Sequence, residues 1–295
     1  MKEPMSFRYR VVDVFTTEPL AGNPLAVFPD ASGIGEDLMQ KIARELNLSE
    51  TVFVRRATRP DSAVQLRIFT PAREVKFAGH PTIGSAFVLM DEGIVPAGSE
   101  RFILEEMVGP VPVHIDRGQR PLIWLTTPPI TFGGSYEPAL CSKLVGLDTK
   151  DMLEIKPELV SAANPAIFIA VREKEAVDRA RVDTGVLAAV NAKEPEPVML
   201  FVFAPTPEGA YSRMFAPDHG VPEDPATGSA TGPLAAFMIK HGLASGGDGT
   251  RFISEQGTKM GRRSLLHVRI RGEKGNEGID VGGYVTPLIE ATMRV

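Results

Sequence analysis

Two segments of the chain repeat one pattern around a residue that can transfer a proton. The first reads Gly79-His80-Pro81-Thr82-Ile83-Gly84-Ser85-Ala86, and the second reads Glu223-Asp224-Pro225-Ala226-Thr227-Gly228-Ser229-Ala230. His80 and Asp224 stand at matching places, and imidazole and carboxyl groups are typical acid–base catalysts in proteins. The repeat therefore predicts that His80 and Asp224 act on the same small molecule.

Each repeat leads into a mainly apolar run that must position these residues. Residues 83–90 and 234–239 are apolar around almost the whole circumference of a helix, which is typical of a buried helix with a sheet wrapped around it. Pro at the first helical position would make His80 and Asp224 the N-cap residues. The alternative is that both residues only cap a helix, which is common for Asp. The duplication, with His at the matching place, favours chemistry.

The start of each helix also predicts a place for an anionic substrate group. Free backbone N–H groups at a helix N-terminus bind anions, and small side chains leave room for them. We expect the N–H groups of Gly84, Gly228 and Ser229 to bind a substrate carboxylate.

The distance between the repeats predicts two similar domains in the 295 residues. We place the first at residues 1–128, completed by a C-terminal strand at about 286–295, and the second at 129–285. The expected hinges are three pairs: Pro128-Pro129, Gly133-Gly134 and Thr286-Pro287.

Composition narrows the class of protein. The formal net charge is −5, from 32 Lys+Arg and 37 Asp+Glu that are interspersed, so we expect no nucleic-acid partner. Cys141 is the one cysteine, which excludes an intrachain disulfide and a cysteine metal site. Residues 1–6 lack the apolar run of an export signal, and no apolar run is long enough to span a membrane. We expect a cytoplasmic protein without a membrane partner.

Short β-type runs dominate the rest of the chain. The clearest helix is Glu36 to Leu46, with Asn47 as its C-cap. Residues 246–249 predict a surface turn, because neither a phosphate loop nor a dinucleotide fingerprint is present. These segments indicate no nucleotide cofactor, and the five histidines are too dispersed to suggest a metal cluster, so we expect no metal. The expected strands are 9–15, 25–28, 51–54, 64–69, 102–104, 111–115, 122–125, 167–171, 198–203, 211–215, 265–270 and 285–289.

Several motifs, in order along nearly the whole chain, resemble the phenazine-biosynthesis PhzF-like family. They are Pro19-Leu20-Ala21-Gly22-Asn23-Pro24-Leu25-Ala26-Val27-Phe28, Ala43-Arg44-Glu45-Leu46-Asn47-Leu48-Ser49-Glu50, Phe77-Ala78-Gly79-His80-Pro81-Thr82-Ile83-Gly84, the second repeat, and Glu255-Gln256-Gly257 followed by Met260-Gly261-Arg262.

The resemblance implies the diaminopimelate-epimerase-like fold, an α/β (α+β) fold of two pseudo-symmetric domains, each a curved mixed sheet around a central helix, with the active site between them. It also implies cofactor-independent proton transfer and a homodimer. The general acid/base of the family's isomerases corresponds to Glu50, and the motif His and Asp correspond to His80 and Asp224.

Two departures from the family pattern stand out. The last motif usually reads Gly-Arg-Pro-Ser, whereas this chain has Gly261-Arg262-Arg263-Ser264. Diaminopimelate epimerases carry Cys at the places of His80 and Asp224, so the composition excludes a two-thiol racemase mechanism.

We assign Glu50 as the proton shuttle, His80 as hydrogen-bond donor or proton relay, and Asp224 as the group that orients a substrate amine or hydroxyl. The expected reaction moves a proton and a double bond in a small, cyclic, unsaturated amino or hydroxy acid. An amino-acid or hydroxyproline-type epimerase, with His80 and Asp224 as opposed bases, is the first alternative, and a noncatalytic binding protein is the second. The expected substrate-binding residues are Asn23, Ser49, Gly79, Gly84, Thr227, Gly228 and Ser229.

Overall fold

The computed structural model of the chain describes residues 5–96 and 98–295. Residues 1–4, which belong to the segment where we expect no export signal, lie outside the described part. The chain forms two units, one made of residues up to Thr126 together with Gly282–Val295, the other of Thr127–Val281. The chain passes between them at residues 126–127 and 281–282.

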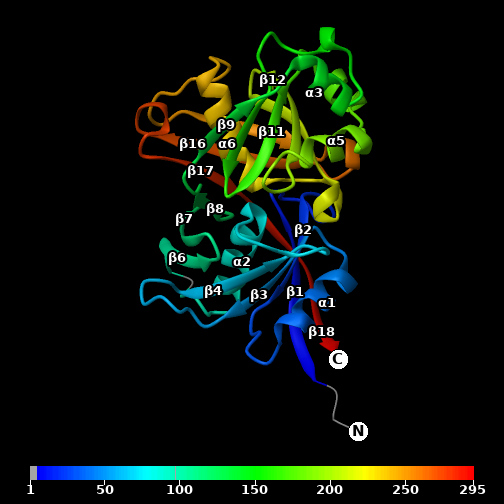
Figure 1. The fold of residues 1–295 in the computed structure, drawn as a ribbon. Coiled ribbons are helices and arrows are strands. Elements are labelled where there is room, and N and C mark those ends of the chain that lie inside the picture. Colours follow the sequence, from blue (N-terminus) through cyan, green and yellow to red (C-terminus); the bar gives the residue numbers. More distant parts are fainter. Residues whose placement is uncertain (1–4, 97) are drawn as a thin grey trace. The chain divides into compact units, whose positions relative to one another are not determined.

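The first unit is a mixed sheet around the buried helix α2 (Gly79–Asp91) (Figure 1). Its strands pair in the order β18-β1-β2-β3-β4-β6-β7-β8, with β5 on β4. Helix α2 contacts β1, β2, β3, β8 and β18 of this sheet. The strands are β1 (Ser6–Val14), β2 (Asn23–Phe28), β3 (Glu50–Arg55), β4 (Val64–Phe69), β5 (Glu74–Val75), β6 (Arg101–Glu106), β7 (Gly109–Asp116), β8 (Leu122–Thr126) and β18 (Val285–Arg294).

A row of aromatic rings packs against α1 (Glu36–Leu46) in this unit. Tyr9 stacks on Phe28 and Phe28 on Phe53, with ring centroids 5.1 and 5.0 Å apart. These residues form a cluster with Met39 and Ile42 of α1. The burial of such large side chains stabilises each by roughly 2 kcal/mol or more.

The second unit repeats this plan around α6 (Gly228–Lys240). Its sheet has the order β9-β10-β11-β12-β13-β15-β16, with β14 on β13. The strands are β9 (Thr131–Ser135), β10 (Glu158–Ala162), β11 (Asn164–Ala170), β12 (Met199–Thr206), β13 (Gly209–Ala216), β14 (Val221–Asp224), β15 (Arg251–Gln256) and β16 (Ser264–Arg271). Helices α3 (Pro138–Leu144), α4 (Lys174–Arg179) and α5 (Thr184–Asn191) belong to a separate core cluster, and β17 (Gly278–Gly283) follows β16.

The internal repeat extends to strand pairing. Strands β2 and β3 are parallel, as are β11 and β12, and each pair is joined through helices. Strands β4 and β6 flank α2 in sequence and pair in parallel, as β13 and β15 do around α6. Both β2 and β11 begin with Asn-Pro, at Asn23 and Asn164. The sequence analysis missed this second shared feature.

Most expected elements are confirmed, but parts of the predicted hinges are wrong. Helix α1 covers Glu36–Leu46, and Asn47 takes the left-handed conformation of a C-cap. Gly133-Gly134 lies inside β9, which pairs with β10 in the second unit, so this pair is no hinge. Thr286-Pro287 lies inside β18, paired with β1, because the chain has already entered the first unit at Gly282.

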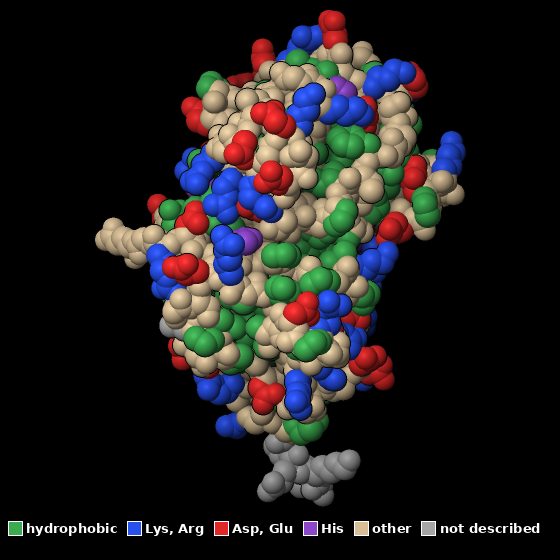
Figure 2. Space-filling view, turned by 90° about the vertical axis from the view of Figure 1, so that its left-hand side faces the viewer, with side chains coloured by type: hydrophobic (Ala, Val, Ile, Leu, Met, Phe, Trp, Pro, Cys, Tyr) green, Lys and Arg blue, Asp and Glu red, His purple; other side chains and the backbone are tan. Residues whose placement is uncertain are grey.

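The described part of the chain has no helix long and apolar enough to cross a membrane. It also brings together no group of three His, Cys, Asp or Glu side chains that could hold a metal ion. Figure 2 shows acidic and basic side chains interspersed over the face in view.

Candidate active site

Three candidate residues of the first unit come together at the start of α2. Asn23 is the first residue of β2, Glu50 is the first residue of β3, and His80 is the second residue of α2. Because β2 and β3 are parallel, with Leu25 opposite Glu50, both strands begin at the same edge of the sheet. Helix α2 packs on both strands, which places His80 beside them.

The side chains form a short polar chain around His80. The amide nitrogen of Asn23 lies 3.2 Å from Nδ1 of His80, and Nε2 of His80 lies 3.3 Å from Oε2 of Glu50. The amide nitrogen of Asn23 can only donate, so Nδ1 of His80 accepts and carries no proton in the neutral ring. The proton of the neutral imidazole is therefore on Nε2, the nitrogen that faces Glu50.

Burial keeps His80 neutral. The residue is 2% exposed, and desolvation by burial lowers its pKa to about 3. A ring with this pKa is a weak base near neutral pH, but its Nε2–H is a good hydrogen-bond donor. The geometry therefore suits the role of hydrogen-bond donor better than the role of proton relay.

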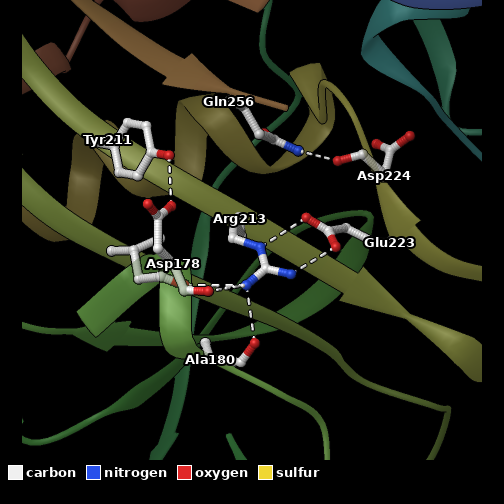
Figure 3. Close-up of polar contacts among 8 residues, drawn as sticks. Asp178, Ala180, Tyr211, Arg213, Glu223, Asp224 and Gln256 are labelled. Atoms are coloured by element: carbon white, nitrogen blue, oxygen red, sulfur yellow. Dashed lines mark hydrogen bonds and ion pairs between the residues drawn. The ribbon is translucent and has the colours of Figure 1, made fainter. Parts of the chain in front are cut away.

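The second unit holds Asp224 through a network of neutral groups, part of which Figure 3 shows. The Thr227 hydroxyl donates to Oδ2 of Asp224 at 2.6 Å. Nε2 of Gln256 donates to the backbone oxygen of Asp224 at 2.7 Å and to Thr227 Oγ1 at 3.0 Å, while Oε1 of Gln256 accepts from Thr227 N at 3.1 Å. All three side chains are buried, so the loop from Asp224 to Thr227 has a fixed shape.

The residue before Asp224 is fixed as well. Arg213 binds Glu223 through two parallel hydrogen bonds of 2.8 and 2.7 Å (Figure 3). The same guanidinium group donates to the backbone oxygens of Asp178 and Ala180, at the C-terminal end of α4. A bidentate, mostly buried pair of this kind sets geometry as well as charge, and here it holds the strand that ends at Asp224.

The prediction that His80 and Asp224 are N-caps is wrong for both. Helix α2 begins two residues earlier, because Ala78 adopts the extended cap conformation and His80 turns inward to Asn23. Asp224 is still in β14, where it pairs with Met214, and Thr227 is the N-cap of α6.

The expected anion donors need one correction. Gly228 and Ser229 are the first two residues of α6, where N–H groups have no acceptor within the helix. Gly84 lies in the second turn of α2, so its N–H belongs to the helix ladder. Its lack of a side chain serves packing instead, because a Cβ there would lie 2.6 Å from Leu25 Cδ2.

The other two expected binding residues also lie near these elements. Gly79 is the first residue of α2 and is buried. Ser49 is half-buried in the bend that joins α1 to Glu50.

The Arg263 departure from the motif has a local consequence. Arg263 forms an ion pair of 2.8 Å with Glu255, beside Gln256.

Gly257 has a φ of +75°, and a Cβ there would lie 2.5 Å from the backbone oxygen of Pro225. The glycine thus lets this segment pack directly under the Asp224 loop.

The sequence analysis missed two buried polar residues that contact the helix starts. Gln256 contacts Asp224 and Thr227, and Glu106 contacts Thr82. Gln256 lies in the Glu255-Gln256-Gly257 motif, which by itself indicates no role for the residue. Glu106 carried no signal, because its partner is far away in sequence.

Two mixed sheets, each around a buried helix, are the plan of the epimerase-like fold, and the relatives of the chain place it among the isomerases. The family model described as phenazine biosynthesis-like protein matches residues 12–291, and the chain belongs to this family. It is 35% identical over 273 residues to the trans-2,3-dihydro-3-hydroxyanthranilate isomerase of Pseudomonas aeruginosa, covering 90% of this chain and 91% of that one.

Solved structures agree in fold. A predicted epimerase from Pseudomonas aeruginosa has a TM-score of 0.84 and 31% identity, covering 97% of this chain and 99% of that one. A PhzF-family phenazine biosynthesis protein from Bacillus anthracis has a TM-score of 0.87 at 22% identity, with coverage of 99% and 100%.

Proposed function

We propose that the protein isomerises a small cyclic, unsaturated amino or hydroxy acid by moving one proton between two carbons, with Glu50 as the group that carries it. The observation behind this proposal is the set of contacts from Asn23 through His80 to Glu50. The related isomerase named for trans-2,3-dihydro-3-hydroxyanthranilate suggests a substrate of that type.

The chemistry balances with a single carboxyl group. Glu50 as carboxylate takes a proton from one carbon, and the electron pair of the broken C–H bond shifts the double bond. The protonated Glu50 then gives the proton to the carbon at the far end of the shifted system, which regenerates the carboxylate. The reaction needs no oxidant or reductant, because the product is an isomer of the substrate.

His80 and Asp224 have separate roles in this proposal. The Nε2–H of His80 donates a hydrogen bond to a substrate oxygen or to Glu50, stabilising charge as the proton leaves. Asp224 accepts from a substrate amine or hydroxyl, and the N–H groups of Gly228 and Ser229 bind the substrate carboxylate. We also propose that Asn23, Ser49, Gly79 and Thr227 contribute to substrate binding. The protein is further proposed to form a homodimer.

The epimerase alternative requires two opposed bases. A His80 with a pKa of about 3 is poorly suited to remove a proton from carbon near neutral pH. The position in β12 that corresponds to Glu50 is Met199, because Ala166 pairs with Met199 as Leu25 pairs with Glu50. A single carboxylate shuttle thus fits better than a symmetric pair of bases.

Turnover of a substrate panel tests the proposal. The panel holds trans-2,3-dihydro-3-hydroxyanthranilate, other cyclic unsaturated amino and hydroxy acids, and proline-type acids for the epimerase alternative. Glu50→Gln should lower kcat by at least about a hundred-fold, the usual contribution of a positioned general base. The matched control is Glu45→Gln, the same change at an exposed site on α1. Normal turnover by the Glu50 variant would contradict the proposal, and turnover of the proline-type acids alone would favour the epimerase.

A further inference from the structure

A second buried carboxyl group lies at the start of α2 and has no part in the proposed reaction. Glu106 is the last residue of β6 and is 4% exposed. Its Oε1 lies 2.5 Å from the hydroxyl of Thr82, in the first turn of α2. Burial raises the pKa of Glu106 to about 8, against the smaller opposite effects of the Thr82 hydroxyl and the Ala78 N–H.

The hydrogen bonds of Thr82 give an independent reason for a neutral Glu106. The Thr82 hydroxyl also lies 2.8 Å from the backbone oxygen of Ala78, which can only accept. The hydroxyl has one proton, so if that proton goes to Ala78, the contact with Glu106 needs a proton on the carboxyl group. Glu106 then donates to Thr82 Oγ1 as a carboxylic acid.

The second unit has a neutral side chain at the corresponding place. Gln256 is the last residue of β15, and β15 pairs with β13 in parallel as β6 pairs with β4. The amide of Gln256 is fully buried and binds the segment that carries Asp224. Each repeat thus has one buried donor–acceptor side chain at the end of the strand after its central helix.

The neighbour of Glu106 provides a contrast within one strand. Glu105 accepts from Thr58 N at 2.8 Å, Thr58 Oγ1 at 2.5 Å, Arg59 N at 3.1 Å and Gln65 Nε2 at 3.1 Å. Burial acts to raise the pKa of Glu105, but these donors together lower it. The pKa values of these adjacent carboxyl groups of β6 therefore shift in opposite directions, because one has several donors and the other faces a hydroxyl that already has an acceptor.

We propose that Glu106 is a positioning residue that works as a neutral carboxylic acid: it holds the first turn of α2, and with it His80, as Gln256 holds the loop of Asp224. Ala78 and Thr82 flank Gly79 and His80, so fixing Thr82 fixes the backbone that orients the imidazole. The effect on turnover rests on the proposed function, whereas the protonation of Glu106 and the position of His80 do not.

The first test is infrared spectroscopy at pH 7 on wild type, Glu106→Gln and Glu105→Gln. Wild type should show the carbonyl band of a buried protonated carboxyl group, Glu106→Gln should lack it, and Glu105→Gln should keep it. The band should fade as pH rises through about 8. A difference spectrum without this band would overturn the proposal, whether or not any substrate turns over.

The second test compares Glu106→Gln with Glu106→Ala by NMR of the His80 ring nitrogens and by kinetics. The amide of Gln can donate to Thr82 and carries no charge, so Glu106→Gln should keep the ring signals and turnover close to wild type. Glu106→Ala should shift the signals and lower kcat roughly ten-fold or more, the order expected from a misplaced catalytic group. If both variants shift His80 equally, Glu106 does not act as a neutral donor. If Glu106→Ala does not fold, the infrared band and the Glu106→Gln variant still test the proposal.

Discussion

The side-chain amide of Asn23 donates a hydrogen bond to Nδ1 of His80 over 3.2 Å, and this contact sets which ring nitrogen carries the proton. The other nitrogen faces Glu50 at 3.3 Å. A residue at the start of one strand thus determines which ring nitrogen of a residue at the start of a helix can donate a hydrogen bond.

Asn23→Asp should reverse this arrangement. The new carboxylate can only accept, so the His80 proton should move to Nδ1. Nε2 then carries no hydrogen and can no longer donate. We expect kcat/KM to fall roughly a hundred-fold, within the range of a lost acid–base partner. The two-bond proton–nitrogen NMR correlations of the ring report the tautomer directly. Asn164→Asp, the same change at the corresponding place in β11, is the control and should leave His80 unchanged. Persistence of the Nε2–H tautomer in Asn23→Asp would contradict this account.

The neutral state of His80 should make the protein sensitive to acid. In the unfolded chain His80 takes up a proton near its ordinary pKa of 6.5, but in the folded protein only near 3. The unfolded state thus binds more protons between these values, so the stability is full above the upper one and declines as pH falls. Wild type should lose roughly 2 kcal/mol relative to His80→Asn between about pH 6 and about pH 4. Urea unfolding measures the difference, and parallel curves for the two proteins would show that His80 is not held neutral.

The helix starts show what the sequence could and could not predict. The duplicated segments and the apolar runs after them were sufficient to predict two buried helices and their sheets, because local pattern and burial agree there. The cap positions were wrong because tertiary contacts decide them: His80 turns to Asn23, and Asp224 pairs with Met214. Local propensity contains neither contact.

Gln256 and Glu106 show a second limit. Each is the last residue of a short strand, and each reaches a helix start that is more than twenty residues away. The charge of Glu106 depends on how many donors surround it, which only the folded structure gives. The adjacent Glu105 is the same residue type, yet its pKa shifts in the opposite direction.

Gly84→Ala should destabilise the first unit although Ala favours helices. The added Cβ would lie 2.6 Å from Leu25 Cδ2 and 2.8 Å from Val14 Cγ2. Overpacking of this kind costs about 1–3 kcal/mol, more than the roughly 1 kcal/mol by which Ala is preferred over Gly in a helix. Gly185→Ala in α5 is the control, because its Cβ would meet only Asp183 Oδ1 at 3.3 Å. Denaturant unfolding of both variants checks this, and an unchanged midpoint for Gly84→Ala would count against the packing described here.

Asp224→Asn tests the proposed contact with a substrate amine. A hydrogen bond to a charged group is worth about 1.5–3 kcal/mol, so KM for an amine-bearing substrate should rise roughly ten-fold or more while kcat changes less. Thr227 can still donate to the amide oxygen, which should preserve the loop. The matched measurement uses a substrate analogue with a hydroxyl in place of the amine. The rise in KM for this analogue should be smaller. An equal effect on both compounds would assign Asp224 to loop structure instead.

In the proposed mechanism, Glu50 alone carries the proton from one carbon to the other. The most direct measurement uses substrate deuterated at the abstracted position, in single turnover in ordinary water, with mass spectrometry of the product. One carboxyl group that removes and returns the proton should pass part of the deuterium to the new carbon, and Glu50→Gln should form no labelled product on this timescale. Product that carries only solvent hydrogen, formed at a normal rate, would contradict the shuttle and point to two separate proton donors or to rapid exchange at an open site.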